Sequence, residues 1–112
     1  MVKLNELVKE QEDVFPNTPN KAMDDVKGLD LQILALCSRK GKDGSFLVIK
    51  ADTSEGEISF TCGGKVIIET LTEAITGLGS EITDEVLVLK EAIECKIIGK
   101  KAESGREYFI FA

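Results

Sequence analysis

The sequence predicts a mainly β domain with five strands and a single helix between the third and fourth strands. Three observations lead to this prediction. Apolar and polar residues alternate in several short runs, Gly- and Asp-containing turns separate these runs, and one segment repeats its apolar residues at helical spacing. The chain has 112 residues, which suits one domain with its own core.

The first three predicted strands follow one another as a meander. Alternation over 29–38 loses its polar partners toward the end, so we expect the second half of this strand to be covered on both faces. Turns over 39–44 and 52–56 separate it from strands over 45–51 and 57–62. One side of the first strand is expected to hold Leu29, Leu31, Ile33, Ala35 and Cys37.

A helix is predicted over 65–77, after Gly63-Gly64 ends the meander. Gly77 and Gly79 are typical of a helix end. The apolar stripe of this helix is expected to comprise Ile67, Leu71, Ala74, Ile75 and Leu78.

The segment 80–91 carries two conflicting signals. Thr83 before two acidic residues is typical of a helix start, whereas Val86–Leu89 has the composition of a strand. We favour helix or irregular structure here. A fourth strand over 93–98 and a fifth over 107–112 then enclose a hairpin loop.

Residues 1–27 differ from the rest of the chain in composition. They contain six acidic residues and both prolines, Pro16 and Pro19. We therefore interpret 1–27 as an N-terminal arm that is partly ordered, and 28–112 as the folded domain.

The order β-β-β-α-β-β is that of the OB-fold, a five-stranded Greek-key barrel in which the helix plugs one end. An open sheet packed on one helix is the alternative. The OB-fold has a preferred binding surface on its second and third strands, flanked by the loops between strands one and two and strands four and five.

Composition excludes several classes of protein. Histidine is absent, which removes Ser-His-Asp and Cys-His catalysis and His-containing zinc sites. Cys37, Cys62 and Cys95 are too far apart for a zinc knuckle, so we expect buried thiols in a reducing compartment. Gly63-Gly64-Lys65 lacks the spacing of a phosphate-binding loop. We expect no enzyme activity, no cofactor and no metal site.

The net charge of −6 disfavours binding to polyanions, but the charges are unevenly distributed. Segments 39–50 and 96–106 each carry four basic residues and one acid, whereas 66–91 carries six acids and one lysine. The basic residues thus fall near the two loops that flank the OB binding surface. Single lysines in hairpins also serve solubility and edge protection.

Binding of single-stranded nucleic acid needs aromatic side chains beside basic ones. We expect Phe46, Val48 and Lys50 to point outward if Leu47, Ile49 and Ala51 face the core, and Tyr108 to be the exposed aromatic residue of the last strand. Phe60 and Phe111 are expected in the core. The candidate nucleic-acid-binding residues are Arg39, Lys40, Lys42, Phe46, Lys50, Lys100, Lys101, Arg106 and Tyr108.

Four runs of sequence carry a family resemblance. They are Gly44-Ser-Phe-Leu-Val-Ile-Lys50, Ile58-Ser-Phe-Thr-Cys-Gly-Gly-Lys-Val-Ile-Ile-Glu-Thr-Leu71, Glu94-Cys-Lys-Ile-Ile-Gly-Lys-Lys101 and Gly105-Arg-Glu-Tyr-Phe-Ile-Phe111. Over residues 28–112 the chain resembles OB-fold single-stranded DNA-binding proteins encoded by phages and mobile elements of Gram-positive bacteria. It departs from them in a longer segment over 79–91 and in ending on Phe109–Ala112 instead of an acidic tail.

The resemblance implies a sequence-tolerant, non-catalytic single-stranded DNA-binding protein of a replication or recombination module. Such a protein would act as a homo-oligomer, a dimer or larger, and could contact a replication protein. The alternative is a small acidic phage-type protein that binds a host protein through 66–91. A signal peptide and a membrane span are absent from the sequence, so we expect the cytoplasm of a bacterial cell.

Overall fold

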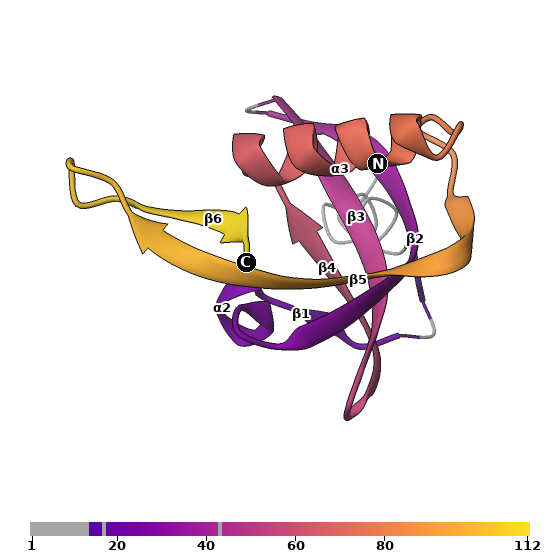
Figure 1. Cartoon of the computed structure of the whole chain (residues 1–112), viewed down its shortest axis with the longest axis horizontal. Coiled ribbons are helices and arrows are strands. Elements are labelled where there is room, and N and C mark those ends of the chain that lie inside the picture. The colour runs from indigo at the N-terminus through magenta and orange to yellow at the C-terminus, as the bar shows by residue number, and fades with distance from the viewer. Residues whose placement is uncertain (1–13, 17, 43) are drawn as a thin grey trace, which may run out of the picture.

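The fold is mainly β, with one curled sheet and few helices (Figure 1). The computed structural model describes residues 14–16, 18–42 and 44–112. Within these residues the elements are β1 (Asn20–Lys21), α2 (Met23–Val26), β2 (Asp30–Gly41), β3 (Gly44–Thr53), β4 (Gly56–Cys62), α3 (Lys65–Gly77), β5 (Leu87–Lys101) and β6 (Glu107–Phe111).

The sheet has the strand arrangement expected of an OB-like fold. Its order is β1-β4-β3-β2-β5-β6, so the meander β2-β3-β4 is followed by α3 and then by the hairpin β5-β6, which joins the free side of β2. Among the described strands β4 and β6 do not pair with each other, and the sheet forms a half-barrel instead of a closed barrel. The two-residue strand β1 pairs in parallel with β4 and accounts for the sixth strand.

A bulge in β2 changes which of its side chains face the core. Ile33 lies opposite Ala51 of β3, but the next paired residue is Ala35, opposite Lys50, so Leu34 is the extra residue. As a result Leu36 packs in the core, and Ala35 and Cys37 do not belong to the core cluster. The expectation that these two residues share a side with Leu31 and Ile33 is therefore wrong.

The second half of β2 is buried on both faces, as the fading polar alternation predicts. Ala35 is 4% exposed, and Leu36 and Cys37 are fully buried. The core-facing side of β3 is the one expected from the sequence, because Leu47, Ile49 and Ala51 all lie in the core cluster.

Helix α3 covers the open end of the half-barrel with its apolar stripe. Its bounds match the predicted helix, and Ile67, Leu71 and Ile75 are its buried residues. Leu78 is 65% exposed, so its assignment to the stripe is wrong. The helix ends at Gly77, and Gly79 adopts a φ of 84°, which turns the chain away.

The strand β5 begins earlier than expected. Residues 87–91, which we assigned to helix or irregular structure, belong to β5. The Ser38 N–H donates to Thr83 O at 2.8 Å, which brings the preceding segment alongside β2, and Leu87 then pairs with Leu36. The exposed edge of β2 needs hydrogen-bond partners, and this requirement outweighs the local helix signal.

Packing extends N-terminal to residue 28. Val26 of α2 is fully buried within the core cluster, and Pro19 O accepts a hydrogen bond from the Ser59 N–H at 2.8 Å. Residues 1–13, which form the first part of the expected arm, lie outside the described residues. No helix in the described part of the chain is long and apolar enough to span a membrane.

Candidate nucleic-acid interface

The candidate basic residues lie mainly on strands, not in loops as the sequence indicates. Arg39 and Lys40 belong to β2, which runs to Gly41, and β3 starts at Gly44. Lys100 and Lys101 likewise belong to β5. The turns of both hairpins are therefore shorter than expected. Strand pairing also determines which residue lies opposite each basic residue.

Phe46 and Arg39 form the first pair of interest. The two residues lie opposite each other in the β2–β3 ladder, so their side chains are neighbours on the same face. Phe46 is half-buried, and its ring lies close to Gly41, where an added Cβ would come within 3.2 Å of Cε1. An arginine beside a partly exposed aromatic ring can bind a phosphate while the ring stacks on a base.

Tyr108 and Lys100 form an equivalent pair on the other hairpin. They lie opposite each other in the β5–β6 ladder, and Tyr108 is 41% exposed. Phe109 and Phe111 pack against the core cluster instead. The predicted orientation of the last strand is therefore confirmed, and so is the burial of Phe60, which is 0% exposed.

A cleft separates β6 from the end of β4 and the start of α3, where a closed barrel would pair its strands. Its volume is about 410 Å³. Gly63 also adjoins the first pair, because a Cβ added there would lie 3.9 Å from Phe46 Cβ. The cleft is lined by Met23, Cys62, Gly63, Gly64, Lys65, Val66, Glu107, Tyr108 and Phe109.

Gly63 therefore links the two aromatic residues, because it adjoins Phe46 and shares the cleft with Tyr108. The Lys65 side chain in the same cleft is 86% exposed, and the carboxylate with which it pairs, Glu69, is 3.9 Å away. Sequence reasoning missed Lys65, since it considered Gly63-Gly64-Lys65 only as a phosphate-binding loop. No sequence signal points to it, because the register that continues from Leu47 opposite Cys62 to Phe46 beside Gly63 is a property of strand pairing.

The middle of the expected binding face is buried. Val48 lies between Phe46 and Lys50 on the outward face of β3, as predicted, but it is only 4% exposed, and its neighbour Cys37 on β2 is fully buried. A ligand on the outer face of β3 therefore has no access to the β3 surface at Val48. Access is confined to the hairpin end, at Phe46, and to the opposite end, beyond Lys50.

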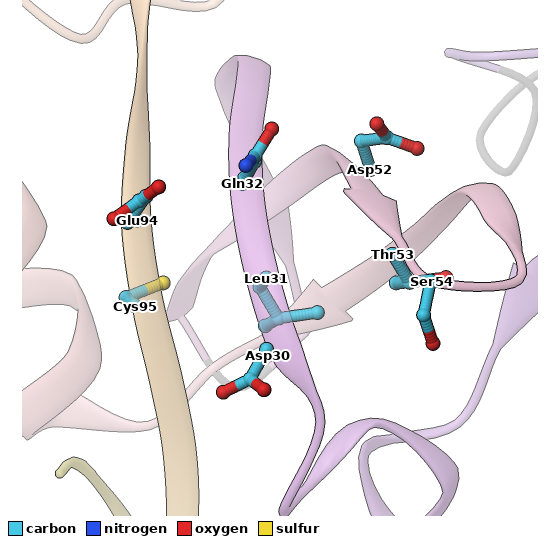
Figure 2. Close-up of a pocket in the computed structure, with 8 residues that line it drawn as sticks. All are labelled: Asp30, Leu31, Gln32, Asp52, Thr53, Ser54, Glu94 and Cys95. Atoms are coloured by element: carbon cyan, nitrogen blue, oxygen red, sulfur yellow. The ribbon is translucent and has the colours of Figure 1, made fainter.

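Carboxylates occupy that opposite end. Asp52 lies opposite Glu57 of β4 and opposite Gln32 of β2, and Gln32 lies opposite Glu94 of β5. We refer to Glu57, Asp52 and Glu94 as the acidic row. Figure 2 shows Gln32 between Asp52 and Glu94 in the hollow that this part of the face forms. The hollow is lined by Asp30, Leu31, Gln32, Asp52, Thr53, Ser54, Glu94 and Cys95.

Lys50 forms an ion pair with one member of the acidic row, Glu57. Its Nζ lies 3.0 Å from Glu57 Oε1, and its side chain is 32% exposed. Among the nine candidate residues, Lys50 thus differs in having a short ion pair with a carboxylate of the protein. Lys40, Lys42, Lys101 and Arg106 are all exposed, with the last two on the β5–β6 hairpin, which projects from the body (Figure 1).

Two of the three thiols are buried as expected. Cys37 and Cys62 are buried and Cys95 is half-buried. Burial raises the pKa of the Cys37 thiol, and the nearby Arg39 guanidinium opposes that shift. Burial also raises the pKa of Cys95 to about 11. Within the described residues no group of three or more metal-ligating side chains comes together.

Comparison with known proteins adds no relative. No family model, curated protein or solved structure matches the chain. The features that bear on function are therefore the two cation–aromatic pairs and the cleft that Tyr108 lines and Gly63 joins to Phe46.

Proposed function

We propose that this protein binds single-stranded DNA without catalysis and with little dependence on sequence, as part of a phage or mobile-element replication or recombination module. The single observation that carries the proposal is the repeated pairing of an exposed or half-buried aromatic residue with a basic residue: Phe46 with Arg39, and Tyr108 with Lys100. Stacking on aromatic rings tolerates every base, because every base has a π-face.

The OB-like strand arrangement supports this proposal, because such folds commonly bind oligonucleotides on this side of the barrel. Fold alone does not set function, and the two pairs are the features of this chain that favour binding to DNA. Each pair can contact only a few nucleotides. We therefore expect several copies of the protein, as dimers or larger oligomers, to bind one strand together. The protein would work in the bacterial cytoplasm, where single strands arise during replication.

The test is a fluorescence-anisotropy titration of a labelled dT oligonucleotide at low and high salt. We expect binding at low salt that weakens steeply as the salt concentration rises, because phosphate contacts release counterions. Arg39→Glu with Lys100→Glu should abolish this binding, because it reverses the cation of each pair. Lys21→Glu with Lys90→Glu is the matched control, because both lysines are exposed strand residues outside the two pairs.

Absence of binding to any single strand at low salt would overturn the proposal. An equal loss of affinity in the Lys21→Glu, Lys90→Glu control would show that net charge alone matters. The acidic alternative, a host-protein partner for 66–91, predicts the reverse pattern. In that case Glu73→Lys on the exposed side of α3 would remove the interaction, and the Arg39→Glu, Lys100→Glu variant would retain it.

A further inference from the structure

The acidic row is maintained against electrostatic repulsion. Asp52 and Glu57 lie directly opposite each other in the β3–β4 ladder, and like charges in that arrangement destabilise a sheet. Lys50 compensates for this repulsion, because its Nζ lies 3.0 Å from Glu57 Oε1. Lys50 therefore has a structural partner that a bound phosphate would have to displace.

A phosphate at Lys50 would meet two costs. Moving the ammonium group away from Glu57 would leave the repulsion between Asp52 and Glu57 uncompensated. The phosphate itself would lie beside the carboxylates of the acidic row, where like charges repel it. The buried surface at Val48 also separates Lys50 from Phe46 on β3, so a strand stacked on Phe46 cannot follow β3 by continuous contact.

Lys65 differs from Lys50 in its exposure and in its ion pair, and the carboxylate of Glu107 in its cleft is already paired with Lys27 Nζ at 3.3 Å. Its side chain is 86% exposed, against 32% for Lys50, and the carboxylate with which it pairs is 3.9 Å away on the same helix. It lines the cleft that Tyr108 also lines, and Gly63 joins this cleft to Phe46. No side chain extends from Gly63 to block the surface between the two aromatic residues.

We infer that bound single-stranded DNA crosses the cleft between β4 and β6, from Phe46 over Gly63 to Tyr108, and does not run along β3. This inference rests on the proposed function and revises the residues that bind the DNA. Lys65 contacts the DNA backbone, Lys50 does not, and the acidic row keeps phosphates off the far end of the face.

The test measures the salt dependence of DNA binding for single charge removals. For a single strand the slope of log K against log salt falls in magnitude by about 0.7 for each phosphate that the protein no longer neutralises. We expect this decrease for Lys65→Gln and no change in slope for Lys50→Gln. Lys90→Gln serves as the control for net charge, and thermal unfolding checks that each variant folds.

A second pair of variants tests the role of the acidic row. In a Glu57→Gln background Lys50 loses its ion-pair partner, and a nucleotide beyond Phe46 can place its phosphate at Lys50 by bridging the surface at Val48 without contact there. Lys50→Gln should then reduce the slope by about 0.7, although it has no effect in the otherwise unchanged protein. Glu73→Gln, which removes an exposed carboxylate of α3, is the matched control background.

The outcomes separate this inference from the proposed function. If the unchanged protein binds DNA and Lys50→Gln lowers its slope as much as Lys65→Gln does, the path across the cleft is wrong and DNA binding stands. An identical response of Lys50 in the Glu57→Gln and Glu73→Gln backgrounds also overturns the role of the acidic row. If the unchanged protein binds no single strand, both proposals fail together.

Discussion

Phe46 lies against Gly41 on the neighbouring strand, with Cε1 only 3.2 Å from the position that a Cβ of Gly41 would occupy. The absence of a side chain at Gly41 thus leaves room for the ring at the hairpin end of the sheet. Arg39, two residues before Gly41 on β2, is the residue directly opposite Phe46. This arrangement places a cation and an aromatic ring side by side. Substitutions at Phe46 test the need for the ring in DNA binding, and a substitution at Gly41 tests the need for the position of the ring.

Replacing Phe46 with Ala should weaken binding of a dT oligonucleotide by about 5- to 150-fold, because loss of one stacked base costs about 1–3 kcal/mol. Phe46→Tyr should retain most of the affinity, since it keeps the ring. Anisotropy titration measures both. Phe46 is half-buried, so circular dichroism must show that the Ala variant remains folded at the assay temperature.

Gly41→Ala should weaken binding less than Phe46→Ala does. The added methyl group needs space that the Phe46 ring occupies, and the ring must move by a few tenths of an ångström. The same titration compares the two variants. Identical affinity of Gly41→Ala and the unchanged protein would mean that the ring position does not matter for DNA binding.

Tyr108→Phe should bind DNA nearly as well as the unchanged protein, whereas Tyr108→Ala should bind about tenfold more weakly. The reason is that stacking needs the ring and not the hydroxyl group. Tyr108 is 41% exposed, so we expect little change in the thermal midpoint for either variant. A decrease in affinity for Tyr108→Phe equal to that for Tyr108→Ala would indicate a hydrogen bond from the hydroxyl group instead.

Phe60→Ala should destabilise the fold by about 3–5 kcal/mol, because it removes a large, fully buried side chain and leaves a cavity in the core. Urea unfolding followed by circular dichroism measures this change. Val88→Ala is the matched surface control, since Val88 is 73% exposed. A comparable destabilisation in both variants would contradict the placement of the core.

Stability should fall as the pH rises from about 9 to about 11, in part because of Cys95. The ordinary pKa of a cysteine thiol is 9.0, and that of Cys95 in the folded protein is about 11. In that range the unfolded chain has released the thiol proton that the folded chain still holds, so ionisation favours unfolding by at most about 1.4 kcal/mol per pH unit. Cys95→Ala should show a shallower alkaline decline in urea unfolding. An identical pH dependence of the two proteins would exclude this contribution of Cys95.

Local patterns determined most of the elements and several side-chain orientations. The alternation over 45–51 set Leu47, Ile49 and Ala51 toward the core, and the helical repeat after Gly64 set both ends of α3. These features succeed because hydrophobic periodicity reports directly on which face of an element is buried. The buried Phe60 and exposed Tyr108 follow from the same reasoning.

Tertiary structure alone decided the features that depend on register between distant segments. The bulge at Leu34 reverses the facing of Ala35 and Cys37, and pairing with Leu36 makes Leu87 part of a strand despite the nearby helix signal. The acidic row joins residues from three strands, and the cleft joins Lys65 to Tyr108. Alternation within one strand carries no information about which residue lies opposite on another. The sequence by itself therefore determined the fold class and the candidate aromatic residues, whereas the pairing of strands decided which basic residues stand beside them.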